Sequence, residues 1–449
     1  MVKYTFIFVF FLFFFVSSSY AQYTFNGRIG GYSLRELKIC SQFGDDSKLI
    51  ATVETDITGE FNYEFVDREK GLYRIYLDSQ DYFDIIFNNE NIELITKTDN
   101  LQYNMIIEES EENKQLYEYI TADMGIGYKI DILKQFLDIY PEGKFYKTVE
   151  NELNTEIKNK DKIINKIIKQ NPGSFASRYI EFLREFPVPV KYNDAEKSVY
   201  IKENYWKYYK MNDLDLLYSN AYSNAVINYF KLLRPFNEQS YYEAVRTIMD
   251  NIFFEDPKIS AFVLEYILSG FELMGFNDAS SKLSYEYGNI CKDNDENNNL
   301  NLRIKSNTDL AIGKKAPDIL AETITGHQYT LSSMTKDYTL IIFWASWCDH
   351  CAAMLPELAK SMWYFSNVDL VAISIDTDED ELNNFIIEKK IPSDLKIICD
   401  YQGWKSEIIS DYAVFATPVM YIVDKELNIV SKPYNEERLV KELNNLLQK

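Results

Sequence analysis

Glycine, proline, cysteine and histidine are all scarce in this chain, and each shortage argues against a class of protein. With 16 glycines and 11 prolines among 449 residues, the chain is not mostly disordered. Five cysteines are too few for a disulfide framework in a protein of this length. A hydrolase that relies on histidine would have only His327 and His350 as candidate catalytic residues. We interpret His327, in Thr325-Gly326-His327-Gln328, as a turn residue.

Basic residues are outnumbered by acidic ones, and the formal net charge is −22. Such a surface repels polyanions and favours solubility. We therefore expect no nucleic-acid partner.

Long apolar runs are missing after the N-terminus, where Tyr4 to Val16 is largely apolar. This run is shorter than the roughly 20 residues that a membrane-spanning helix needs. Lys3 before it, and the small residues Ser19 and Ala21 after it, are typical of a signal peptide cleaved before Gln22. We predict a signal peptide at 1–21, export to the periplasm, and no stable membrane insertion after cleavage.

The remaining residues are too many for one hydrophobic core, and their patterns divide them into three parts. Residues 22–104 contain short runs rich in Tyr, Phe, Ile and Val with turn signals such as Thr58-Gly59 between them, which predicts an antiparallel β-sandwich. The expected strands are 23–28, 37–42, 50–55, 60–65, 73–77, 83–87 and 92–96.

Residues 105–310 carry apolar residues at three- and four-residue spacing, which predicts an all-α domain. Breakers such as Asn171-Pro172-Gly173 separate several helices, and the polar, Asn-rich segment 292–307 is predicted to be a linker at the end of this domain. The expected helices are 113–122, 129–136, 144–169, 174–183, 195–211, 219–233, 240–252 and 259–271.

Residues 311–449 alternate between strand and helix patterns, which predicts an α/β layered fold with a central sheet. The expected strands are 338–343, 369–376, 396–400, 419–423 and 429–431, and the expected helices are one starting near Cys351, then 379–390, 406–412 and 436–448.

The first of these strands leads into Trp344-Ala345-Ser346-Trp347-Cys348-Asp349-His350-Cys351. Two cysteines three apart at a strand-to-helix junction are typical of a thiol–disulfide exchange site. The free N–H groups and the dipole of a helix N-terminus favour a thiolate at Cys348, and Cys351 can then resolve the mixed disulfide.

This motif, Gly313-Lys314-Lys315-Ala316-Pro317-Asp318 and Ala416-Thr417-Pro418-Val419 together resemble the thioredoxin fold, in particular the exported TlpA/ResA-like thiol–disulfide oxidoreductases. The resemblance covers about 311–449. It implies that Cys348 is the exposed nucleophile, that Cys351 is the buried resolving thiol, and that the Thr417–Pro418 bond is cis. A cis proline beside the pair leaves a backbone edge on which an extended client peptide can dock.

Other residues around the pair bear on its chemistry. Trp347 either packs against the helix or forms a stacking wall for client peptides. Asp349 and His350 are expected to modulate the redox potential: a protonated His350 stabilises the thiolate and Asp349 opposes it. One partly exposed charge supplies roughly 1–2 kcal/mol. The difference of about 150 mV between thioredoxin and DsbA corresponds to about 7 kcal/mol, so the motif alone does not set the direction, and we take reduction as the expected one.

Two departures from the resemblance concern proton transfer. Met354 stands where members of this family often have a carboxylate, and Ile342 stands where cytoplasmic thioredoxins have a buried aspartate. Proton transfer at Cys351 then uses water, Asp349 or Glu357.

The other cysteines are interpreted structurally. Cys399 is expected to be a core thiol in a buried strand, and Cys40 and Cys291 either pair with each other or are buried singly.

We therefore predict an exported thiol–disulfide oxidoreductase without cofactor or metal. Its expected partners are client proteins with disulfides or thiols and a redox partner that recycles the dithiol. Two alternatives stay open. One is a peroxiredoxin-like peroxidase, although Ala345 and Ser346 occupy the positions where that chemistry has threonine. The other is a ligand- or partner-binding protein with a vestigial thioredoxin domain.

Overall fold

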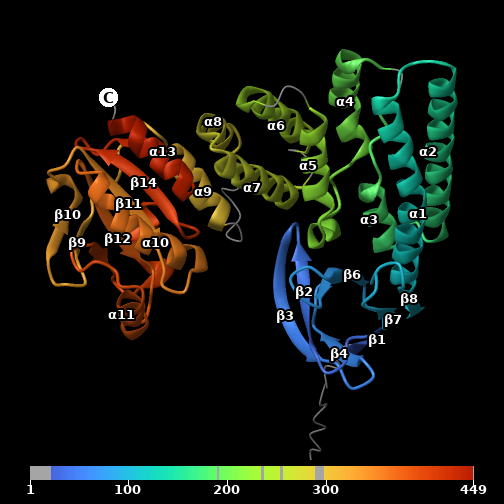
Figure 1. Cartoon of the computed structure of the whole chain (residues 1–449), viewed down its shortest axis with the longest axis horizontal. Coiled ribbons are helices and arrows are strands. Elements are labelled where there is room, and N and C mark those ends of the chain that lie inside the picture. The colour runs from blue at the N-terminus through green and yellow to red at the C-terminus, as the bar shows by residue number, and fades with distance from the viewer. Residues whose placement is uncertain (1–21, 190–191, 234–236, 253–255, 289–297, 448–449) are drawn as a thin grey trace, which may run out of the picture. The chain divides into compact units, whose positions relative to one another are not determined.

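The computed structural model describes residues 22–189, 192–233, 237–252, 256–288 and 298–447 (Figure 1). The predicted signal peptide at 1–21 and Cys291 lie outside these residues. The chain forms two compact units. The first consists of the described residues up to Pro187 together with Asp213–Ala225, and the second consists of Val188–Asn212 together with the described residues from Val226 onward. The helices predicted between 105 and 310 are thus divided between the two units, and the boundaries at 104 and 310 stay predictions.

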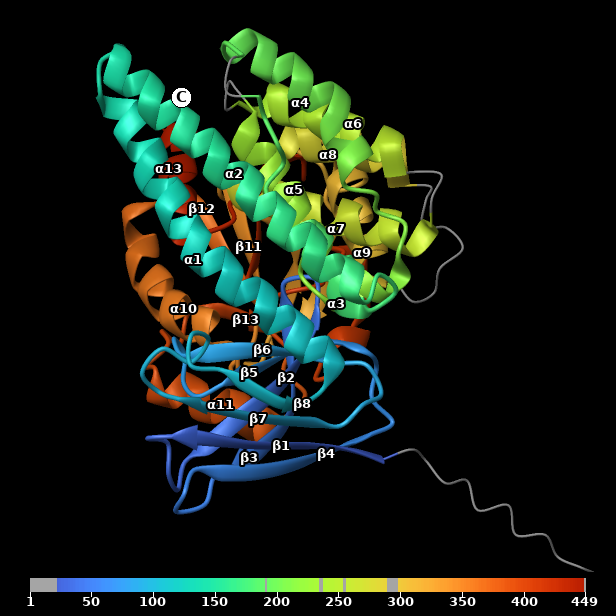
Figure 2. The same ribbon diagram turned by 90° about the vertical axis from the view of Figure 1, so that its right-hand side faces the viewer.

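The first unit begins with two four-stranded sheets packed face to face, in the orders β4-β1-β7-β8 and β3-β2-β5-β6. Figure 2 shows β5 and β6 of one sheet over β1 and β7 of the other. Alternate residues of both sheets point inward and form one apolar core around Phe25, Phe65 and Phe87. The strands are β1 (Gln22–Gly30), β2 (Glu36–Phe43), β3 (Asp46–Glu54), β4 (Glu60–Val66), β5 (Gly71–Tyr76), β6 (Tyr82–Phe87), β7 (Ile92–Lys97) and β8 (Ile106–Glu109).

The predicted sandwich is confirmed, with one correction to its pairing. β1 and β7 run parallel, whereas the other pairs in the two sheets are antiparallel. The two strands lie far apart in the sequence, so no hairpin turn forces them to run in opposite directions.

Helices of the first unit pack on the end of β6. The Asn113 side chain is fully buried and exchanges two hydrogen bonds with the backbone of Ile86, at 2.8 and 2.7 Å. The neighbouring Glu112 carboxylate accepts hydrogen bonds from the N–H groups of Phe175 and Ala176, where the third helix begins. The elements are α1 (Glu111–Ile139), α2 (Lys144–Gln170), α3 (Phe175–Leu183), η1 (Leu214–Tyr218) and α5 (Ala221–Leu232), the last extending into the second unit. Where two helices, 113–122 and 129–136, were expected, the single long helix α1 is present.

The other helices of the second unit are α4 (Asp194–Tyr208), α6 (Glu238–Ile252), α7 (Pro257–Met274), α8 (Asn277–Tyr287) and α9 (Asn298–Thr308). The predicted linker at 292–307 is wrong from residue 298 onward, because α9 occupies this part. The buried face of α9 includes Arg303, Ser306 and Asn307, so its pattern shows little apolar periodicity. Among the described helices, none has an apolar stretch that would cross a membrane.

The C-terminal domain, orange to red in Figure 1, has a five-stranded sheet in the order β13-β12-β11-β14-β15. β11, β12 and β13 are parallel, and β14 and β15 are antiparallel to their neighbours. Phe343 contacts Tyr412 and the next residue, Trp344, contacts Phe385 of α11, so helical segments cover both faces of the sheet. The elements are β9 (Leu320–Glu322), β10 (Gln328–Thr330), η3 (Leu331–Ser333), β11 (Tyr338–Trp344), α10 (Asp349–Ser361), η4 (Met362–Tyr364), β12 (Val368–Ser374), α11 (Glu379–Glu388), β13 (Lys396–Ile398), η5 (Gly403–Lys405), α12 (Glu407–Asp411), β14 (Val419–Asp424), β15 (Ile429–Ser431) and α13 (Glu436–Leu447). The predicted α/β thioredoxin-like fold is confirmed.

Helix α9 docks on this domain through polar contacts. Lys432 Nζ donates hydrogen bonds to the carbonyl oxygen and the hydroxyl of Ser306, at 2.7 and 2.8 Å, and lies over the ring of Tyr421. Burial lowers the pKa of Lys432 to about 8, although the nearby carboxylate of Glu272 acts in the opposite direction.

This lowered pKa predicts a pH dependence of stability. Between about pH 8 and the ordinary lysine pKa of about 10.4, the unfolded chain holds a proton on Lys432 that the folded chain has released. Over this range the contribution of Lys432 to stability therefore rises with pH. We expect the urea midpoint of the C-terminal domain in the full chain to rise from pH 7.5 to 9.5 relative to that of a Lys432→Met variant. Parallel midpoints in the two proteins would contradict this.

Candidate active site

The two cysteines of the motif lie at the end of the central strand and the start of a helix. Residues Leu340 to Trp344 of β11 are fully buried, which fixes the point at which the chain leaves the sheet. Cys348 is the N-cap of α10, and its Sγ accepts a hydrogen bond from the N–H of Cys351 at 3.3 Å. The sulfur thus lies at the positive end of the helix dipole, where a thiolate is stabilised.

The structure joins Cys348 and Cys351 in a disulfide, with a Cα–Cα distance of 5.2 Å. Cys348 is 9% exposed and Cys351 is fully buried, so Cys348 is the more accessible residue of the pair. The order of attack by the two sulfurs stays a prediction.

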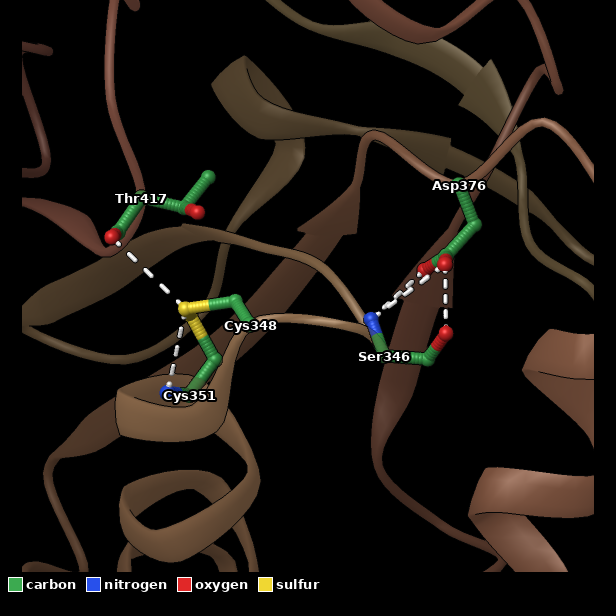
Figure 3. The surroundings of a disulfide bond; sticks show 5 residues. All are labelled: Ser346, Cys348, Cys351, Asp376 and Thr417. Carbon is green, nitrogen blue, oxygen red and sulfur yellow. Dashed lines mark hydrogen bonds between the residues drawn. A yellow bond between two sulfur atoms is a disulfide. The ribbon is translucent and has the colours of Figure 1, made fainter. Parts of the chain in front are cut away.

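The loop before β14 lies directly beside this disulfide. The Thr417–Pro418 peptide bond is cis, and the carbonyl oxygen of Thr417 lies 3.6 Å from Cys348 Sγ (Figure 3). The structure therefore brings together four of the predicted site residues, Cys348, Cys351, Thr417 and Pro418. The docking role of the last two stays a prediction.

Asp376, which the sequence analysis did not single out, holds the loop before the disulfide. It is 1% exposed, and its carboxylate accepts hydrogen bonds from the N–H of Ser346, at 3.0 and 3.2 Å, and from the Ser346 hydroxyl at 2.6 Å (Figure 3). The hydroxyl of Ser374 also donates to this carboxylate. A carboxylate at the carboxyl end of the apolar strand β12, next to the motif in a parallel sheet, is the signal that would have indicated it.

The remaining predicted site residues face solvent. Trp347 is 56% exposed, and Asp349 and His350 lie exposed in the first turn of α10. Of the two carboxylates considered for proton transfer, Glu357 forms an ion pair with Lys360 at 3.0 Å on the exposed face of α10. Asp349 is exposed as well, so the group that transfers the proton at Cys351 stays a prediction.

Two further cysteines lie in the described residues, and neither is part of the dithiol. Cys40 is buried in β2. Cys399 was expected within a buried strand, but β13 ends at Ile398 and Cys399 is only partly buried. Its Sγ lies 3.5 Å from the backbone carbonyl of Asp376, and burial raises the pKa of its thiol.

Comparison with known proteins agrees with this geometry. A model of the AhpC/TSA family matches residues 312–432. The thiol–disulfide oxidoreductase ResA of Bacillus cereus is 27% identical over 130 residues, which are 28% of this chain and 72% of ResA. Two solved structures are also similar. A thiol–disulfide oxidoreductase from Bacteroides fragilis is 27% identical. The match covers 30% of this chain and 99% of the Bacteroides fragilis chain, with a TM-score of 0.27. A thioredoxin-like protein from Bacteroides caccae is 17% identical. The match covers 58% of this chain and 99% of the Bacteroides caccae chain, with a TM-score of 0.39.

The family model matches the part of the chain that folds around Cys348 and Cys351. The C-terminal part of this chain is therefore a thioredoxin-fold thiol–disulfide oxidoreductase domain similar to ResA.

Proposed function

We propose that this protein reduces disulfides of client proteins outside the cytoplasm through the Cys348–Cys351 dithiol. The observation that carries the proposal is the position of Cys348 Sγ, at the N-cap of α10 and beside the Thr417 carbonyl. Export is supported by the apolar run from Tyr4 to Val16 and by the small residues that follow it.

The reaction is a two-step exchange that starts from the reduced dithiol. The Cys348 thiolate attacks one sulfur of a client disulfide; a Cys348–client bond forms, and the other client sulfur leaves as a thiolate and takes up a proton. Cys351, once deprotonated, then attacks Cys348 Sγ. The Cys348–Cys351 disulfide forms, and the client leaves with both of its sulfurs reduced. Two electrons pass to the client, and a dithiol redox partner restores them.

The charges at the helix start support the reducing direction, although they are too weak to set it alone. Stabilising the Cys348 thiolate relative to the disulfide would make the pair a stronger oxidant. Asp349, in the first turn of α10, places a negative charge next to this sulfur and works against His350. We therefore expect a redox potential closer to about −270 mV, as in thioredoxin, than to about −120 mV, as in DsbA.

Trapping with a Cys351→Ser variant tests the proposal. Without the resolving thiol the second step stops, so we expect mixed disulfides between Cys348 and client proteins to accumulate. They should be recovered from the fraction outside the cytoplasm and should disappear on treatment with dithiothreitol.

The matched control is the double variant Cys348→Ser with Cys351→Ser, which should trap nothing. If the single variant also traps nothing, the exchange proposal is wrong and a binding protein with a vestigial domain is favoured. Consumption of hydrogen peroxide by the wild-type protein, with no client trapped, would favour the peroxidase alternative instead.

A further inference from the structure

An aromatic groove lies next to the disulfide, on the side away from the cis-proline loop. Its volume is about 640 Å³, and the loops that follow β11, β12 and β13 line it. In the sheet order β12 and β13 lie on one side of β11, the strand that leads into the disulfide, whereas β14, which follows Pro418, lies on the other side. Open α/β sheets bind their ligands at the carboxyl ends of parallel strands, and this groove occupies that position.

Two indole rings belong to the groove. Trp347 is 56% exposed and Trp404 is 49% exposed, while the buried Ile375 lies between their loops. Exposed tryptophans on a rigid frame are the side chains that most often dominate protein–peptide contacts. Trp347 immediately precedes Cys348, so a side chain bound here belongs to a residue close to the reacting client cysteine.

The groove is built by a close approach of two loops. Gly403 has a left-handed backbone with φ +59, and a Cβ there would lie 2.8 Å from Thr377 Cγ2. Glycine thus lets the Trp404 loop pack directly on the loop after β12.

The rim of the groove is acidic. Thr377, which lines it, is followed by the exposed residues Asp378, Glu379 and Asp380 at the start of α11. Burial and then the charge of Cys399 raise the pKa of the Tyr401 phenol, and the Glu379 carboxylate adds to this. Glu379 lies two residues after the lining Thr377, and Lys405 is the lining residue of opposite charge.

We propose that this groove, lined by Trp347, Tyr401 and Trp404, binds an aromatic side chain of the client within a few residues of the client's cysteine and selects clients with lysine or arginine beside that aromatic residue. The inference rests on the proposed exchange function and specifies its substrate class. An extended client then crosses the disulfide, with its backbone at Thr417 and its aromatic side chain between the two tryptophans.

Paired peptides test this specificity. Each peptide carries one intramolecular disulfide, with a Lys-Tyr-Lys segment two residues from one cysteine, and matched peptides have Ala for Tyr or Glu for both Lys. The rate of reduction is measured from the release of peptide thiols. For the Tyr peptide we expect Trp404→Ala to lower kcat/KM by roughly 10-fold, through KM. The Ala peptide should react equally with both proteins.

The charge of the rim gives a second measurement. The wild-type protein should prefer the Lys peptide over the Glu peptide, and Glu379→Gln should reduce this preference by roughly threefold, as expected for one exposed charge pair. Tyr364→Ala, which changes another exposed aromatic residue of the domain outside the groove, is the matched control and should alter neither comparison.

A small disulfide separates this inference from the proposed function. The reduced wild-type and Trp404→Ala proteins should reduce hydroxyethyl disulfide at the same rate, because this small aliphatic probe has no aromatic ring to occupy the groove. If both proteins react with it but reduce the Tyr and Ala peptides equally, the groove is not a client site and the exchange function stands. If the wild-type protein reacts with neither probe, both proposals are wrong.

Discussion

Replacing Cys348 by Ser is expected to lower the rate of disulfide reduction by at least about 1,000-fold, because the hydroxyl that replaces the sulfur neither ionises near neutral pH nor forms a disulfide. The rate is measured on the full chain with the Tyr peptide disulfide and dithiothreitol as the reductant. The change is small in volume and Cys348 lies at a helix N-cap, where serine is a favoured residue, so the fold should be retained.

The matched control is Cys399→Ser. Cys399 is a half-buried thiol of the same domain that lies near Asp376 but is not part of the dithiol. Its replacement should leave the rate within about a factor of two, since substitutions away from a reacting group are usually within about 0.5 kcal/mol. If Cys399→Ser lost as much activity as Cys348→Ser, the assignment of the reaction to Cys348 alone would be wrong.

Much of the architecture was predictable from the sequence, because most elements bury one face or both. The strands of the sandwich alternate inward and outward residues, and β11 is an unbroken apolar run. The dithiol was equally visible, since two cysteines at a strand-to-helix junction need no tertiary information. Helix α9 was not predictable in this way: Arg303 pairs with Glu272 and lies over the ring of Phe415. Its buried face is therefore polar, and only the partners on α7 and the C-terminal domain show why it folds.

The groove and the Asp376 contact could not be predicted for a different reason. Both join loops whose contacting residues are 26 or more positions apart in the chain, from the ends of neighbouring parallel strands. A sequence pattern shows where such a strand ends but not which loop lies beside it. The strand order β13-β12-β11 supplies this information, and it places the loop with Asp376 next to Ser346 and the loop with Trp404 next to Thr377.

Replacing Asp376 by Ala is expected to destabilise the C-terminal domain by roughly 2–4 kcal/mol, because the N–H and hydroxyl of Ser346 and the hydroxyl of Ser374 lose their common acceptor inside the protein. Asp376→Asn keeps the volume and one oxygen, so its cost should be smaller, about 1 kcal/mol. Both values are measured as the shift of the urea midpoint of this domain in the full chain.

The position of Asp376 predicts a local effect on the dithiol in addition to the loss of stability. Ser346 lies two residues before Cys348, so a loop that has lost this acceptor no longer holds the sulfur at the helix N-cap. Hydrogen exchange of the segment 345–351 should become faster in Asp376→Asn, and its redox potential should shift under conditions in which the domain is still folded.

Asp424→Ala is the matched control for both effects. Asp424 ends β14 and accepts hydrogen bonds from the N–H groups of Glu426 and Asn428, at 3.0 and 2.8 Å. It pairs with Tyr338, at the end of β11 opposite to the motif. Its loss should lower the urea midpoint and leave the exchange of 345–351 and the redox potential unchanged. If Asp424→Ala changes these two quantities as much as Asp376→Asn does, they report the overall stability of the domain and Asp376 has no special role. If only Asp376→Asn changes them, the geometry of the dithiol depends on a carboxylate of the neighbouring strand, because the parallel sheet brings the ends of β11 and β12 together.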